Sequence, residues 1–256
     1  MNKISIALTA TALVFSSLNA HAEVRFGVMN EAYPPFFTKN ASGEWVGWEI
    51  DLMDAVCAEM KEKCTIVDMA WDGLLPALGA KKFDVIWSSM SITDDRKKVI
   101  NFTNSYYKTP SKLIGAKDGT KAASPSELEG KSIGIQAATI QSEYYKKYFA
   151  DKASEKTYAT LDEAFQDLSA GRIDYVFGDS VPLAEFLKSD FGKRCCEDKG
   201  DVKDDPAILG MGIGGGLRKD DTELLARLND AIAAIRANGK YAEISKKYFE
   251  FDPYGQ

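Results

Sequence analysis

Short apolar runs and longer amphipathic stretches alternate along the chain from residue 24 onward. Runs of strand length lie at residues 24–29, 65–69, 85–88, 112–116, 132–136, 156–158, 173–177 and 210–217. Stretches with the period of an amphipathic helix lie at residues 48–61, 73–79, 141–149, 161–170, 222–237 and 241–249, with Gly239 as the cap between the last two. Because strands that alternate with helices form parallel sheets with crossover helices, the pattern predicts an α/β fold.

The predicted elements fall into two sets. Residues 106–110 separate the first set from the second, and residues 201–212 lead from the second set to the terminal helices. Two neighbouring crossings would make the second set an insertion in the first, which predicts two α/β lobes joined by a two-strand hinge, with the ligand cleft between them. We expect residues 23–108 and 211–256 to form lobe 1 and residues 109–210 to form lobe 2.

Residues 1–22 have the pattern of a secretory signal peptide. Lys3 precedes an apolar run at residues 4–15, and Ala20-His21-Ala22 is a cleavage site of the small-x-small type. The apolar run is too short to span a membrane, and the cleavage point has no cysteine for a lipid anchor. We therefore expect cleavage before Glu23 and export as a soluble protein without a membrane anchor.

Cleavage at this point also removes His21, the only histidine of the chain. Without an imidazole, Ser-His-Asp and Cys-His catalysis and histidine-containing zinc sites are excluded, and we expect neither a metal nor a cofactor. The formal charge changes from −6 to −7 when Lys3 leaves, which argues against nucleic-acid and anionic-lipid partners. The glycine-rich residues 212–216 lack the lysine of a phosphate-binding loop, so they do not predict nucleotide binding.

The chain has four cysteines, and in an exported protein cysteines usually pair. Cys57 and Cys64 flank a tight reversal between a predicted helix and a predicted strand, which favours a disulfide between them. Cys195 and Cys196 are adjacent. The spacing leaves three alternatives open for them: a strained ring between the two neighbours, two free thiols, or pairing with Cys57 and Cys64.

The segment 88–96 carries the most informative chemistry. It follows the buried-strand pattern of residues 83–87, and it places three serines in a turn before Arg96 in the first turn of a helix. Hydroxyl and backbone N–H groups are neutral donors, and a guanidinium holds both oxygens of a carboxylate in a planar fork. The segment therefore predicts capture of a small carboxylate. The alternative is a surface turn and helix cap with a solvated Arg96.

Six blocks together carry a resemblance to a known family. They are residues 33–36 (YPPF), 47–52 (GWEIDL), 71–76 (WDGLLP), 88–96 (SSMSITDDR), 170–174 (AGRID) and 216–219 (GLRK). The chain after residue 22 resembles the periplasmic solute-binding proteins of family 3, particularly the lysine/arginine/ornithine- and histidine-binding type. The resemblance implies two α/β lobes that close on a ligand, and a monomer that delivers a polar amino acid to the permease of an ABC transporter.

The same resemblance assigns ligand-binding roles. Arg96 would hold the α-carboxylate of the ligand together with Ser91 and Thr139, and Asp179 would hold the α-ammonium with help from the carbonyl or hydroxyl of Ser89. A helix that begins at Thr139 would add free N–H groups and its dipole. Asp179 has an ordinary alternative as the N-cap of a helix that starts near residue 182.

Aromatic residues would bind the ligand side chain. Tyr33 and Trp71 would cover its methylenes and face a cation with π density. The other expected ligand-binding residues are Asn30, Glu31, Ser88, Met90, Ala138, Ile140 and Gln141. The two aromatic residues have an alternative as ordinary core residues. Glu49 lies in the first turn of the predicted helix at residues 48–61, and there we expect it to interact with the helix dipole and not with the ligand.

The chain departs from the family pattern near the predicted site. Asn30 stands where binders of cationic amino acids have an acid, with Glu31 beside it, while Ala138 replaces a glycine and Ile140 a threonine. An amide cannot neutralise a buried cation, so either Glu31 or Ser88 compensates or the ligand preference differs.

Arginine, lysine or ornithine is the expected ligand, and histidine, an opine or another polar amino acid is the alternative. We expect a binding protein and not an enzyme. Some relatives on this scaffold are cyclohexadienyl dehydratases, which use carboxylates and lysines of the cleft, and these provide the alternative from a different class.

Overall fold

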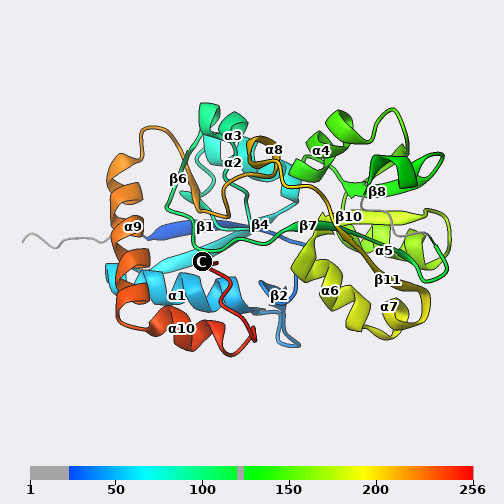
Figure 1. Ribbon diagram of the computed structural model, residues 1–256. Helices are drawn as coiled ribbons and strands as arrows, with labels where there is room; N and C mark the ends of the chain where they lie inside the picture. The colour runs from blue at the N-terminus through cyan, green and yellow to red at the C-terminus, as the bar shows by residue number, and fades with distance from the viewer. Residues whose placement is uncertain (1–22, 120–123, 256) are drawn as a thin grey trace, which may run out of the picture.

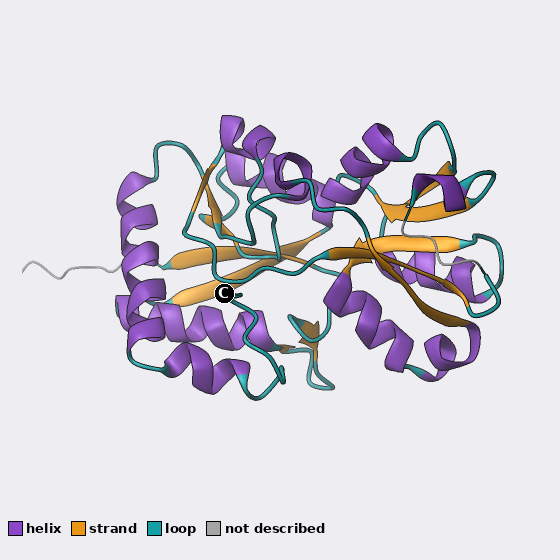
Figure 2. Cartoon of the chain, viewed as in Figure 1, coloured by secondary structure: helices purple, strands orange, loops and turns teal. Residues whose placement is uncertain are grey.

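The computed structural model describes residues 23–119 and 124–255, so the predicted signal peptide lies outside the described residues. Two α/β lobes lie side by side, as the sequence pattern predicted (Figure 1). The blue N-terminal elements and the orange and red C-terminal helices form lobe 1, and the green and yellow middle of the chain forms lobe 2. Each lobe has a five-stranded sheet with helices packed on it (Figure 2). Along these residues no helix has both the length and the apolar character of a membrane span.

Lobe 1 contains two stretches of the chain. Its elements are β1 (Val24–Met29), β2 (Thr38–Lys39), β3 (Trp45–Val46), α1 (Trp48–Met60), β4 (Cys64–Met69), the 3-10 helix η1 (Trp71–Gly73), α2 (Leu74–Gly79), β5 (Val85–Ile86), α3 (Asp94–Val99), β6 (Asn101–Phe102), β12 (Gly216–Leu217), α9 (Thr222–Ala237) and α10 (Lys240–Ser245). The sheet order is β4-β1-β5-β12-β6, and β2 pairs with β3 separately. β1 is parallel to β4 and β5, whereas β12 is antiparallel to both of its neighbours.

Lobe 2 is built from the middle of the chain. Its elements are β7 (Ser111–Ala116), the 3-10 helix η2 (Pro125–Leu128), β8 (Ser132–Gln136), α4 (Ile140–Tyr148), β9 (Ser154–Tyr158), α5 (Leu161–Ser169), β10 (Tyr175–Asp179), α6 (Ser180–Lys188), α7 (Asp190–Cys195), β11 (Cys196–Asp201) and α8 (Pro206–Leu209). The order is β11-β7-β10-β8-β9, with β7 antiparallel to β10 and β11. Both sheets are therefore mixed, and the expectation of parallel sheets was wrong for the strands next to the crossings, because these strands lead the chain out of one lobe and back.

Strand alternation buries both faces of the lobe 2 sheet. Leu113 and Phe177 pack in one apolar cluster with aromatic residues of α4, whereas Ile114 and Val176 pack in another with residues of α5 and α6. Because the sheet is covered on both faces, only its edges and strand ends can carry polar chemistry. β10 ends at Asp179, on the side of lobe 2 where the chain crosses to lobe 1.

Two neighbouring segments connect the lobes. Tyr107 in the first segment pairs with Ile213 in the second, whose N–H donates to the Tyr107 carbonyl at 2.8 Å. The predicted strand at residues 210–217 is shorter in the structure, since only its last two residues join the sheet. Gly212 has φ +115, and a Cβ there would lie 2.3 Å from Ser105 Oγ, so this glycine allows the two segments to approach closely.

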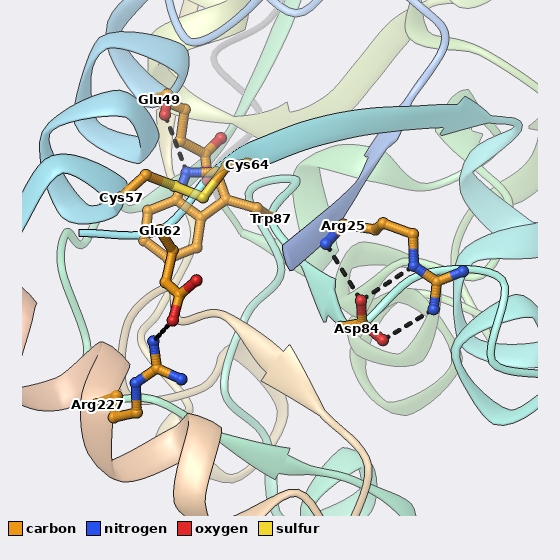
Figure 3. The surroundings of a disulfide bond; sticks show 8 residues. All are labelled: Arg25, Glu49, Cys57, Glu62, Cys64, Asp84, Trp87 and Arg227. Carbon is orange, nitrogen blue, oxygen red and sulfur yellow. Dashed lines mark hydrogen bonds and ion pairs between the residues drawn. A yellow bond between two sulfur atoms is a disulfide. The ribbon is translucent and has the colours of Figure 1, made fainter. Parts of the chain in front are cut away.

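Disulfides join both cysteine pairs. Cys57, near the end of α1, is bonded to Cys64 at the start of β4, as the sequence favoured (Figure 3). Cys195 and Cys196 are bonded to each other at the junction of α7 and β11, which is the neighbour ring among the alternatives left open by the spacing. Both bonds connect the end of a helix to the strand that follows it, and each lobe contains one.

Candidate functional site

A cavity lies between the lobes and receives polar residues from both. Expected site residues that line it are Tyr33, Trp71, Ser88, Ser89, Ser91, Arg96, Thr139, Ile140, Gln141 and Asp179. The first six belong to lobe 1 and the last four to lobe 2. The fold thus brings together residues that are up to 146 positions apart, as in the pair Tyr33 and Asp179.

Arg96 is the cationic group of this cavity. It lies in the first turn of α3, where the Thr93 hydroxyl caps the helix by accepting from the Arg96 backbone N–H at 3.2 Å. Its guanidinium donates to the Ser91 carbonyl at 3.0 Å and lies 5.5 Å from the Trp71 ring. Burial lowers the pKa of Arg96 to about 10, with the charge of Asp179 acting in the opposite direction. The side chain therefore stays protonated at neutral pH and still has N–H groups for an anion.

Asp179 is the facing carboxylate, supplied by lobe 2. It occupies the N-cap position of α6, yet its side chain makes no capping hydrogen bond, so the alternative role as a helix cap is not realised. Its Oδ1 accepts from Gln141 Nε2 at 3.0 Å and its Oδ2 from the Tyr33 hydroxyl at 2.6 Å. Burial raises the pKa of Asp179, while these two hydrogen bonds and the charge of Arg96 lower it only in part.

The start of α4 closes the cavity from lobe 2. Thr139 caps the helix, because its hydroxyl accepts from the Ser142 N–H at 3.4 Å and donates to the Gln136 carbonyl at 2.7 Å. Ala138 has φ +56, a conformation that glycine adopts more easily. Its carbonyl accepts from Trp71 Nε1 at 3.3 Å and from the Arg96 guanidinium at 3.4 Å, so Ala138 touches lobe 1 through its backbone. The free N–H groups of the first turn favour an anion near Arg96.

The serine turn lies opposite, after β5. Ser88 accepts from the Met29 N–H at 3.0 Å, and Ser89 adopts φ +53. The Ser89 hydroxyl donates to Glu49 Oε2 at 2.8 Å. Glu49 lies in the first turn of α1, as expected, and it is also fully buried against the serine turn, a contact that the sequence did not indicate. Tertiary packing brings the start of α1 against the serine turn, and no local pattern signals that contact.

Four expected residues lie outside the cavity lining. Met90 is buried in the core of lobe 1, and Ala138 contributes only its backbone. The side chain of Asn30 is exposed. Glu31 is half-buried, and its Oε2 has no hydrogen-bond partner within the described part of the chain. An unpaired buried carboxylate oxygen is costly, and a cation brought by a ligand would compensate for it.

Glu31 belongs to an acidic group beside Trp71. Burial raises the pKa of its carboxyl, the backbone N–H groups of Glu31 and Trp71 lower it, and the negative charges of Asp72 and Glu163 raise it. Glu163 comes from α5 of lobe 2, so both lobes contribute to this acidic group. These carboxylates lie outside the cavity lining but close to Trp71, which lines it, so they favour a positive charge near that residue.

Some lining residues were not expected from the sequence. They are Met29, Gln136, Leu161, Phe177 and Gly178. Most of them are close neighbours of expected residues at the ends of predicted strands, so the signal was the strand end itself. Leu161 is the exception, because it starts a helix whose amphipathic pattern only indicates burial in the lobe.

The chemistry available in the cavity is recognition of a small zwitterion. A guanidinium on one lobe and a carboxylate on the other line the same space, with hydroxyl and amide groups between them. Across residues 23–119 and 124–255, no group of three or more histidine, cysteine, aspartate or glutamate side chains could hold a metal ion.

Comparisons with known proteins agree with this arrangement. A model of the bacterial extracellular solute-binding proteins, family 3, matches residues 24–251. The L-arginine-binding protein of Pseudomonas aeruginosa is 41% identical over 260 residues, which span 100% of this chain and 99% of the relative. The histidine-binding periplasmic protein of Salmonella typhimurium is 40% identical over 262 residues and 100% of both chains. A solved ancestral arginine-binding protein bound to arginine has a TM-score of 0.80 and 30% identity, covering 89% of this chain and 98% of its own.

Proposed function

The chain belongs to the bacterial extracellular solute-binding proteins of family 3, and on that basis we propose that it binds an L-amino acid with a cationic side chain. Arginine, lysine and ornithine are the favoured ligands, and the protein delivers them to the permease of an ABC transporter. The names of two similar proteins, one L-arginine-binding and one bound to arginine, support this choice.

The observation that carries the proposal is the pair of opposite charges across the cleft. Arg96 of lobe 1 and Asp179 of lobe 2 line one cavity. In the proposed complex the α-carboxylate of the ligand accepts from Arg96 and from the N–H groups at the start of α4. Its α-ammonium donates to Asp179. An amino acid placed this way contacts both lobes, and it therefore favours the closed arrangement over an open one.

The preference for a cationic side chain rests on the acidic group beside Trp71. Glu31, Asp72 and Glu163 supply negative charge, and Glu31 Oε2 lacks a partner. Tyr33 and Trp71 offer ring faces for methylenes and for a guanidinium or ammonium group. Glu31 thus supplies the negative charge that Asn30, an amide, cannot provide to a cationic ligand side chain.

The proposed site of action is the periplasm, reached through cleavage after residue 22. One relative is named a periplasmic protein, and the first 22 residues have the composition of a signal peptide. We propose a monomer, since one chain supplies both halves of the cleft.

The test is calorimetric titration of protein that has been unfolded and refolded to remove any copurified ligand. Arginine, lysine and ornithine should bind. Citrulline, which has nearly the shape of arginine without its charge, should bind at least about tenfold more weakly. Equal binding of citrulline would contradict the cationic preference, and failure of every amino acid to bind would contradict the proposal as a whole. Conversion of prephenate or arogenate would instead support the dehydratase alternative.

A further inference from the structure

Glu49 is a buried carboxylate that the proposed ligand contacts do not use. It follows Trp48 at the start of α1, and its exposed fraction is 0%. Its backbone carbonyl accepts from Trp87 Nε1 at 2.9 Å, which holds the start of α1 against the end of β5 (Figure 3). The side chain therefore reaches the serine turn that follows β5.

The described hydrogen bonds to this carboxylate come from neutral groups. Oε1 accepts from the Ser89 backbone N–H at 3.0 Å and from the Tyr106 hydroxyl, and Oε2 accepts from the Ser89 hydroxyl at 2.8 Å. Two of these three donors belong to one residue, Ser89. A buried carboxylate without a cation among these partners is expensive for a structure to keep, so a role beyond packing is indicated.

Ser89 has an unusual conformation at the cavity wall. Its φ of +53 lies in the left-handed region, which residues with a Cβ seldom occupy. It is 8% exposed and lines the cavity that also contains Asp179. The two hydrogen bonds from Ser89 to Glu49 hold this conformation, because they engage the backbone N–H and the side chain together.

The same contacts fix the polarity of the Ser89 hydroxyl. A hydroxyl has one proton and two lone pairs, and here the proton is directed to Glu49 Oε2. The lone pairs of the oxygen then remain for donors around it, and the Tyr107 side chain is also within its reach. An ammonium group has donors only, so an acceptor fixed in this way is complementary to it.

We propose that Glu49 is a positioning residue for ligand binding, which holds Ser89 so that its oxygen atoms accept hydrogen bonds from the α-ammonium of the ligand. The inference rests on the proposed amino-acid binding. The ammonium is then held from both lobes, by Ser89 on lobe 1 and by Asp179 on lobe 2. Tyr106, the other donor to Glu49, precedes Tyr107 of the first connecting segment. The Tyr106 backbone carbonyl in turn accepts from the Tyr241 hydroxyl of α10 at 2.7 Å.

The direct test is E49Q. The carboxamide keeps the size of the side chain but has one oxygen, so one Ser89 donor meets an NH2 group. Arginine affinity, measured by calorimetry, should fall about tenfold or more. The matched control is D84N, the same chemical change in the same lobe, which removes partners of Arg25 and Arg218 away from the cavity. D84N should lower Tm and leave the affinity within about twofold of the wild type.

A double-mutant cycle separates positioning from general support. Glycine adopts positive φ without a Cβ penalty, so E49Q should weaken binding less in an S89G background than in the wild type. If E49Q weakens arginine binding equally in both backgrounds, the positioning role is overturned. Wild-type affinity in E49Q would also overturn it. So would a parallel loss of Tm and affinity in both E49Q and D84N.

If E49Q does not fold, Y106F decides. Phenylalanine keeps the ring stack on Trp87, whose centroid lies 4.3 Å away, and removes only the hydroxyl donor to Glu49. A loss of affinity of about threefold or more supports the inference, and unchanged affinity overturns it. Failure of the wild-type protein to bind any amino acid would contradict the proposed function itself. That outcome differs from failure of the Glu49 inference, because it is seen in the wild-type protein without any variant.

Discussion

The Tyr33 hydroxyl of lobe 1 donates to Asp179 Oδ2 of lobe 2 at 2.6 Å. This contact joins the two halves of the cleft at the carboxylate proposed to hold the ligand ammonium. Trp71 and Arg96 add two more contacts across the cleft, both to the Ala138 carbonyl. The lobes are thus held together by groups that are themselves candidates for ligand binding, which couples closure to occupancy of the site.

Arg96 is predicted to be essential for binding. R96A should abolish measurable arginine binding, and R96K should weaken it by about 100-fold, because an ammonium retains the charge but not the planar fork. Titration calorimetry with K98A as the control checks this, since Lys98 is exposed on the same helix. Undiminished affinity in R96A would exclude Arg96 as the carboxylate partner.

Asp179 is predicted to lower the free energy of unfolding of the ligand-free protein and to strengthen arginine binding. Burial raises its folded pKa above the unfolded value, so its ionised form destabilises the ligand-free protein at neutral pH, and this destabilisation disappears as the pH falls through the folded pKa. D179N should leave the free energy of unfolding at pH 7 unchanged or raise it by up to about 1 kcal/mol, and it should weaken arginine binding at least about 100-fold. Thermal unfolding and calorimetry measure the two effects. A large loss of stability in the ligand-free variant would contradict this view.

The raised pKa of Asp179 also makes ligand binding depend on pH. The ammonium needs an ionised Asp179, so arginine affinity should begin to fall at a pH above the range in which an ordinary aspartate protonates. Titrations between about pH 4 and pH 8 would show this. Constant affinity over that range would mean that Asp179 does not hold the ammonium.

Glu31 is predicted to control selectivity for the ligand side chain. E31Q should lower the affinity for arginine by about tenfold and leave the affinity for citrulline nearly unchanged, because only the charged side chain needs the carboxylate. E59Q, an identical change at an exposed position of α1, provides the control. An equal loss for both ligands would assign Glu31 a structural role.

The disulfide between Cys57 and Cys64 is predicted to stabilise lobe 1 without affecting the site. Replacing both cysteines with serine should reduce the free energy of unfolding by about 2 kcal/mol, as expected for closure of a short loop. Denaturant unfolding gives the stability and calorimetry gives the affinity. Loss of arginine binding in a folded variant would show that the bond also holds the cleft.

Much of the fold followed from apolar patterning. The bounds of β1, β8 and α9 were predicted from the sequence as the structure has them. β11 was missed because Cys196–Asp201 is mostly polar, as suits an edge strand that pairs only with β7. The two-residue strand β6 was missed, and β12 is only the end of the longer strand predicted at residues 210–217. So short a strand forms because of pairing partners that are distant in sequence.

The site was less accessible to pattern reasoning. From the residues alone Asp179 was favoured as a helix cap, whereas Arg96 was predicted to hold a carboxylate, with a solvated side chain as the alternative. The family resemblance favoured the ligand roles of both. Glu49 was correctly expected in a first helical turn, which is an ordinary place for an acid, but its contact with the serine turn was missed. Its burial against Ser89 and Tyr106 arises from contacts 40 and 57 residues away, which no local rule contains.

The most direct test of the account is a crystal structure of the stripped protein with arginine added. In that structure both α-carboxylate oxygens should accept from the guanidinium of Arg96, and the α-ammonium should donate to Asp179. The ligand guanidinium should lie beside Glu31, between Tyr33 and Trp71. Arginine bound outside this cleft, or bound with its α-ammonium away from Asp179, would contradict the account.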